Sequence, residues 1–310
     1  MYTILIFICS LSQSLLAQQE ALRMMYPMMP LGINPAKAGT SKVASVSGFY
    51  RKKPLFSVPG LTSLSQQYLS FDMPIQDESW GIGFLGFNSS QAFADGTGAI
   101  ASNLGIAGVA SKHFLIGEDQ QVSIGANIGV NQKPVITANG NTVLKGSYGL
   151  GFLYQYKNLQ VGISRPSAYM ESGLATTAPI YGQAEVLLDL SSGDKVRLGS
   201  VVRHLNANGI SDTKIDLYGV YWLNEVVGIG AWYLTTGAEM GNAALLGSAQ
   251  VALGRNFMVS YAYDFLGKSI TSSSLSSSSL SSNDSSSGFH QIGIRYEIDL
   301  GNGKINRFRP

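Results

Sequence analysis

The sequence predicts an all-β fold, a transmembrane β-barrel of about fourteen antiparallel strands. Two observations lead to this prediction. Apolar residues alternate with small or polar ones at a period of two through many segments of the chain. Charged residues make up only 13% of the chain, whereas a soluble domain carries roughly 25%, so few charges are available to cover a wetted exterior.

The clearest alternation lies in a hairpin between Ser147 and Pro166. Aromatic and aliphatic residues occupy every second position on both sides of the turn Lys157-Asn158, and glycine, serine or glutamine stands between them. A soluble sandwich or a large lipocalin-like barrel would turn the apolar face inward, whereas a membrane barrel turns it toward lipid. The shortage of charge favours the membrane barrel.

The same pattern predicts the other strands in order along the chain. They are expected at Val43–Tyr50, Leu61–Pro74, Trp80–Phe84, Ala99–Phe114, Val122–Val130, Gly182–Leu190, Lys195–Leu205, Lys214–Leu223, Val226–Thr235, Ala244–Leu253, Asn256–Phe265 and Gly288–Ile298. Many approach the roughly 9–11 residues that a tilted strand needs to cross a bilayer. An open sheet would leave an unpaired edge in lipid, so we expect the sheet to close.

The connections between these strands alternate between short and long. The long ones are residues 51–60, 89–98, 131–145, 166–181, 206–213, 236–241 and 266–287. This alternation is typical of an outer-membrane barrel with short periplasmic turns and longer extracellular loops. The last loop, 266–287, is rich in serine, which predicts a flexible surface segment with too few apolar residues to fold, and a binding segment is the alternative.

The two ends of the chain differ from the barrel. Residues 1–17 carry an apolar run that ends in a small residue, Ala17, which predicts a cleaved secretory signal. Cys9, the only cysteine, would leave with it, which excludes a disulfide framework or a thiol nucleophile in the mature chain. Residues 18–42, without a sustained period, are expected to form an irregular or briefly helical periplasmic segment ahead of the sheet that plugs or straps part of the protein. The barrel is assigned to 43–298 and a C-terminal tail to 299–310.

No pattern in the sequence indicates a catalytic, cofactor or metal site. The histidines His113, His204 and His290 lack metal-ligand spacing, and the glycine-rich runs lie within strands. No Gly-x-Ser-x-Gly turn supports a hydrolytic triad, so a lipid-processing serine enzyme stays a distant alternative. A net charge of +2 without a basic stripe gives no case for nucleic acid. We therefore predict a non-enzymatic protein without cofactor or metal.

Charged residues within the predicted strands mostly fall on the face opposite the apolar one, so they are expected to point into the lumen. They are Arg197, Arg203, Asp216, Asp264, Arg295 and Glu297. Because buried charges need partners, a ladder of ion pairs is the favoured interpretation, and a transport pathway is the alternative.

The segment Ile33–Thr40, INPAKAGT, resembles the Asn-Pro-Ala box near the start of PorP/SprF proteins, a family of type IX secretion outer-membrane proteins. Further similar stretches are Arg51, Pro59-Gly60, Leu69–Ile75, Trp80–Gly83, Tyr261–Phe265 and Gly288–Tyr296. The positions that match the family motifs, without an assigned role, are Asn34, Pro35, Ala36, Gly39, Arg51, Asp72 and Pro74. The chain departs from the family in lacking a tryptophan shortly after Arg51.

This resemblance implies an integral protein of a Bacteroidota-type outer membrane, surrounded by its lipid and acting with type IX secretion components. It further implies export or surface anchoring of large secreted proteins, including gliding adhesins, whose C-terminal sorting domain the barrel would bind. Residues 34–40 would help to close the periplasmic side. A passive porin or uptake channel is the alternative, against which the many glycine, serine and alanine residues at expected inward positions argue.

Overall fold

The structure, a computed structural model, describes residues 27, 29–54, 61–93, 100–117, 119–134, 142–169, 179–190, 193–207, 210–235, 243–264 and 290–299. Two short 3₁₀ turns, η2 (Pro30–Gly32) and η3 (Pro35–Lys37), precede the strands. The strands are β1 (Ala44–Pro54), β2 (Leu61–Ile75), β3 (Trp80–Phe93), β4 (Ile100–Leu115), β5 (Gln120–Pro134), β6 (Thr142–Tyr156), β7 (Leu159–Tyr169), β8 (Ile180–Asp189), β9 (Lys195–Ala207), β10 (Ile210–Leu223), β11 (Val227–Thr235), β12 (Ala243–Leu253), β13 (Phe257–Asp264) and β14 (His290–Ile298). Within these ranges no helix has the length and hydropathy to cross a membrane.

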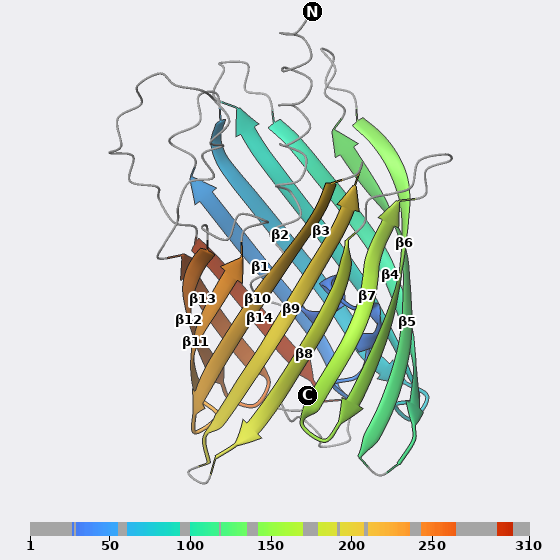
Figure 1. Ribbon diagram of the computed structural model, residues 1–310, viewed down its shortest axis with the longest axis vertical. Coiled ribbons are helices and arrows are strands. Elements are labelled where there is room, and N and C mark those ends of the chain that lie inside the picture. Colours follow the sequence, from blue (N-terminus) through green and yellow to red (C-terminus); the bar gives the residue numbers. More distant parts are fainter. Residues whose placement is uncertain are drawn as a thin grey trace, which may run out of the picture.

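The sheet closes into one barrel of tilted strands (Figure 1). Neighbouring strands pair antiparallel, and β1 pairs with both β2 and β14. The closing register runs from Ala44 opposite Ile298 to Lys52 opposite His290. Closure gives each strand a partner on both sides, so no backbone edge faces lipid. The predicted all-β barrel of about fourteen antiparallel strands is confirmed.

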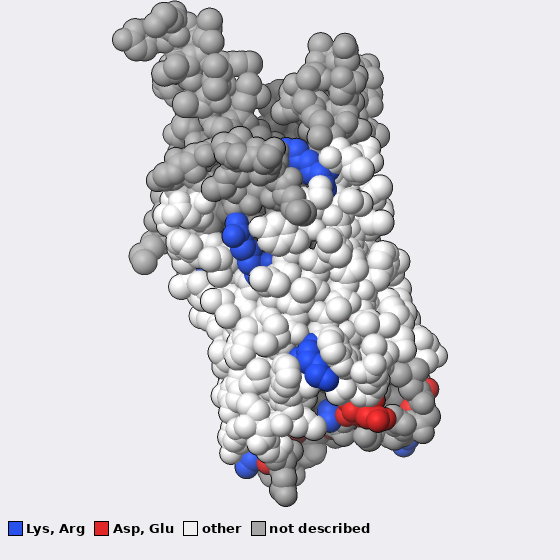
Figure 2. All heavy atoms as spheres, turned by 90° about the vertical axis from the view of Figure 1, so that its right-hand side faces the viewer, with Lys and Arg blue, Asp and Glu red and all other residues white. Residues whose placement is uncertain are grey.

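The large apolar side chains point away from the barrel axis. On β5, Ile124 and Ile128 are 51% and 70% exposed, whereas Ser123 and Asn127 on the alternate positions are buried. Figure 2 shows one wall as a broad band of uncharged side chains with few, separate Lys and Arg residues, while Asp and Glu lie at the lower end. This apolar exterior is the lipid-facing surface that the alternation predicts.

Tight turns join the strands at one end of the barrel, the lower end in Figure 1. Residues 76–79 link β2 to β3, residues 157–158 link β6 to β7, and residues 224–226 link β10 to β11. Lys157 and Asn224 have φ angles of 50° and 46°, the left-handed conformation that tight hairpin turns use. The short periplasmic turns expected from the sequence are therefore present.

The expected connections 236–241 and 266–287 lie outside the described residues, as do the expected signal 1–17 and the tail from residue 300. Strands also extend into the expected connections 51–60, 89–98, 131–145 and 166–181, where β1, β3, β5, β6, β7 and β8 are longer than predicted. The expected connection 206–213 is shortened most. β9 continues to Ala207 and β10 begins at Ile210, with Asp212 paired to Leu205. The dipeptide Asn208-Gly209 favours two-residue hairpins, which explains why the strands extend into this segment.

A charge in the middle of the apolar belt tests the membrane assignment. We expect Ile128→Arg, halfway along β5, to lower the free energy of unfolding in lipid by about 2–4 kcal/mol, because lipid at this depth solvates charge poorly. Leu253→Arg, at the short-turn end of β12, should lose only about 0–1 kcal/mol, because its guanidinium reaches the interface. Urea titration of barrels refolded in phospholipid vesicles measures both losses. Equal losses would contradict the depth assigned to β5.

The lumen is wider than the wall side chains alone can fill, as expected for a barrel of this strand number. On one side the rings of Tyr218 and Trp232 stack with centroids 6.0 Å apart. They belong to a buried apolar cluster that also includes Met29 and Ile33. These two residues are not part of the wall but precede β1, so the chain itself occupies part of its lumen.

Candidate functional site

Residues 29–43, which lead into β1, lie inside the lumen, and we call this segment the plug. Leu31, Asn34 and Ala38 have no exposed surface, and η3 contacts β4, β5 and β6. The plug ends beside the short turns, where Lys42 Nζ is 2.9 Å from Glu78 Oε2. Residues 18–42 are expected to plug or strap part of the protein from the periplasm, whereas the structure places residues 29–42 inside the short-turn half of the lumen. These residues fit inside the lumen because glycines on the inner face of the wall leave room for them.

Asn34 shapes the plug and attaches it to the wall. Its Oδ1 accepts a hydrogen bond from Ala36 N at 2.9 Å and caps η3, and its Nδ2 donates to the Phe152 carbonyl of β6 at 3.0 Å. Pro35 occupies the first position of the turn, where a backbone N–H has no partner in the turn anyway. An amide both accepts and donates, which suits asparagine to this position. The Asn-Pro-Ala box is thus a capped turn fastened to β6.

Glycines on the inner face of the wall make room for the plug, and we call Gly81, Gly125 and Gly151 the glycine cradle. A side chain on Gly125 of β5 would collide with the backbone of Pro35, and one on Gly81 of β3 with the carbonyl of Ala38. Backbone obstacles cannot move aside by changing rotamer, so these positions need glycine. The alternation of the strands predicts that these glycines point inward, but it does not predict that they receive another segment of the chain.

Asp72 of β2 holds the far end of the plug. Its Oδ2 accepts from Gly39 N at 2.9 Å, and its Oδ1 accepts from Ser45 Oγ at 2.5 Å. Gly39 has a φ of 68°, and a Cβ there would lie 2.8 Å from the Cα of Gly81, so only glycine fits. Asp72 is buried, and a buried carboxylate is stable only with such donors.

Two lumen serines donate to plug carbonyls. Ser111 Oγ of β4 donates to Ala38 O at 2.7 Å, and Ser164 Oγ of β7 donates to Ile33 O at 2.6 Å. Ser111 Oγ also lies 3.3 Å from Nε2 of the buried His113. No sequence motif marks either serine, although the alternation of their strands turns both inward. The hydroxyl of Ser111 is engaged with the plug, which leaves it poorly placed to act as a nucleophile.

The structure gathers all but one of the motif positions at the plug. Asn34, Pro35, Ala36 and Gly39 belong to the plug, and Asp72 and Pro74 lie against it on β2. The Pro74 Cα would be 3.1 Å from a Cβ on Gly39. Arg51 lies apart, farther along β1, where its Nη1 donates to Gln66 Oε1 at 3.5 Å.

The charges expected in the lumen lie on the inner face wherever their side chains are described. Arg203, Asp216 and Glu297 are buried, and the side chains of Arg197 and Arg295 are each 11% exposed. Arg295 Nε is 3.0 Å from Glu297 Oε1, and Arg197 Nε is 3.7 Å from Glu185 Oε1. The side chain of Asp264 lies outside the described residues. In the described part of the chain, no three His, Cys, Asp or Glu residues come together in a way that could hold a metal ion.

A closed barrel with an apolar belt and a plug formed by its own chain is an integral outer-membrane protein. The chain belongs to the PorP/SprF family of type IX secretion system membrane proteins, whose model matches residues 15–296. The protein is therefore an outer-membrane component of type IX secretion, with other secretion components as its partners.

Several solved structures are similar to the chain. The Acinetobacter baumannii outer membrane protein Omp33 is 7% identical with a TM-score of 0.46, and the match covers 83% of this chain and 98% of that one. CdiB from Acinetobacter baumannii is 9% identical with a TM-score of 0.47, covering 83% and 60% of the two chains. A mutant of Rh. blastica porin is 10% identical with a TM-score of 0.36, covering 83% and 99%. No protein of curated function matches the sequence.

Proposed function

We propose that this barrel is a non-enzymatic part of the secretion machinery that supports export or surface anchoring of large secreted proteins by binding their C-terminal sorting domain. Membership of the PorP/SprF family supports the secretion role. The fastened plug is the observation that supports an anchor over a channel. With the short-turn half of the lumen occupied by the chain itself, a client would bind the loops or the outer half of the lumen.

The plug also argues against the alternative, a passive porin. A porin needs a continuous aqueous path along its lumen. Here the inward glycines of the wall receive plug backbone instead of lining such a path, and the plug is held by hydrogen bonds to Asp72, Ser111 and Ser164. In planar bilayers we expect the wild-type barrel to show little steady current. A substantial open-state current would favour the porin.

Deleting the gene tests the proposed role directly. We expect the client adhesin to disappear from the surface of intact cells, as measured by immunofluorescence, because its sorting domain loses its anchor. Reintroducing the wild-type gene should restore display, and the amounts of unrelated outer-membrane proteins should not change. Purification of the barrel from outer membranes in mild detergent should recover the sorting domain. Unchanged surface display after deletion would end the proposal.

A further inference from the structure

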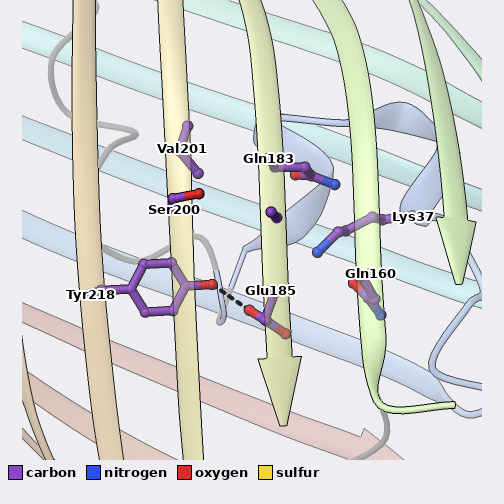
Figure 3. A pocket seen from close by; sticks show the side chains of 8 residues that line it. Lys37, Gln160, Gln183, Glu185, Ser200, Val201 and Tyr218 are labelled. Carbon is purple, nitrogen blue, oxygen red and sulfur yellow. Dashed lines mark hydrogen bonds between the residues drawn. The ribbon is translucent and has the colours of Figure 1, made fainter. Parts of the chain in front are cut away.

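The plug leaves a small cavity on one side of the lumen, around Lys37. Toward β3, β5 and β6 it lies against the glycine cradle. Toward β8–β10 it extends Lys37, the only charged residue between Met29 and Ser41, into a small cavity (Figure 3). The cavity is also lined by Gln160, Gln183, Ala184, Glu185, Ser200, Val201 and Tyr218. About 10 Å³ of it is open, room for about one water molecule.

Glu185 of β8 is the acid that faces Lys37 across this cavity. The hydroxyl of Tyr218 donates a hydrogen bond to Glu185 (Figure 3), and Arg197 Nε lies 3.7 Å from its Oε1. One carboxylate therefore compensates two cations. Burial lowers the pKa of Lys37, the negative charge of Glu185 opposes that shift, and Arg197 adds to it. The charge of Lys37 is thus costly in the lumen and depends on Glu185.

Two further polar groups weaken the contact between Lys37 and the barrel wall. Among the described residues, Gln160 Oε1 and Gln183 Nε2 are buried and have no hydrogen-bond partner. Both side chains line the cavity at Lys37. Buried polar groups without a partner are destabilising, so the cavity offers the ammonium of Lys37 little besides the charge of Glu185. The neighbouring part of the plug is held separately, by Ser164 of β7 and by the apolar cluster that contains Met29 and Ile33.

We propose that Glu185 is an electrostatic latch, which keeps the plug closed on this side by compensating Lys37 across the cavity. When the balance is broken, the plug moves away from β8–β10 and the lumen conducts. The latch concerns the closed state of the lumen and is independent of which client the barrel serves.

Substitutions that remove a charge but keep the size of the side chain separate the latch from simple loss of packing. Glu185→Gln keeps the shape but leaves Lys37 and Arg197 facing each other, and we expect the mean conductance in planar bilayers to rise about tenfold, because breaking a buried pair is strongly unfavourable. Lys37→Met removes the cation with a side chain of similar length. The barrel of this variant should stay closed, since Glu185 still pairs with Arg197. The double variant K37M/E185Q should also stay closed, because no charge remains on the plug.

Lys37→Glu supplies a second variant in which no barrel strand is altered. It places two carboxylates at the cavity and should raise the conductance as much as Glu185→Gln. Heat-modifiable migration in gels shows that each variant has folded. The latch is refuted if folded E185Q and K37E conduct no more than wild type, if K37M leaks as much as E185Q, or if wild type already conducts freely.

Discussion

Gly125→Val is expected to push the plug out of the lumen and to turn the closed barrel into a conducting one. The new Cβ would lie where the backbone of Pro35 and Ala36 now passes. Overpacking inside a protein commonly costs about 1–3 kcal/mol, and an obstacle made of backbone offers no rotamer to relieve it. We expect the closed barrel of this variant to lose at least that much relative to the open one. Conductance in planar bilayers measures the change.

Gly108 provides the matched control for this substitution. It lies on β4, and a Cβ there would meet no atom within 4 Å. Gly108→Val adds the same side chain to the same kind of strand without touching the plug, so its conductance should equal that of wild type. If Gly125→Val folds and conducts no more than Gly108→Val, the role assigned to the glycine cradle is wrong.

Asp72→Ala should be the most destabilising change at the far end of the plug. It removes the acceptor of both Gly39 N and Ser45 Oγ in a buried site. Each donor left without an acceptor is expected to cost about 1–3 kcal/mol, so the two together should lower the free energy of unfolding by about 2–6 kcal/mol. Urea titration of the barrel in phospholipid vesicles measures this loss.

Two control variants test whether the loss of stability in Asp72→Ala comes from its contact with the plug. Asp189→Ala removes a carboxylate that is 60% exposed and pairs with Lys195 at 2.9 Å, and an exposed pair contributes about 0–1 kcal/mol. Ser45→Ala removes one of the two donors and should fall between, at about 1 kcal/mol. A loss at Asp72 no larger than the loss at Asp189 would show that Asp72 does not anchor the plug.

The barrel was predictable because its signal is local. Alternation at a period of two identifies the outer face of a strand from its own residues, as with Ile124 and Ile128 on β5. The low share of charge then indicates that this face meets lipid. Closure followed from the cost of an unpaired edge in a membrane. None of these inferences requires knowing which distant residues are in contact.

A plugging segment was expected, but its contacts could not be predicted in the same way. The resemblance to the PorP/SprF family marked Asn34, Gly39 and Asp72 and implied that residues 34–40 help to close the periplasmic side, but it left the role of each residue open. Their partners lie far away in the chain: Gly39 and Asp72 are 33 residues apart, and Asn34 and Phe152 are 118 apart. Alternation places Asp72 on the inner face and says nothing of what it binds there.

The sequence by itself determined that this chain forms a closed barrel with its apolar side toward lipid, because strand alternation and scarcity of charge are properties of neighbouring residues. Only the tertiary structure decided what the inside does. Gly125 and Gly129 are both inward glycines of β5, yet a Cβ on Gly125 would meet Pro35 of the plug, whereas one on Gly129 would meet Ile106 and Ala107 of the neighbouring strand. The difference comes from a segment about 90 residues earlier in the chain, and contacts across such separations follow from packing rather than from local pattern.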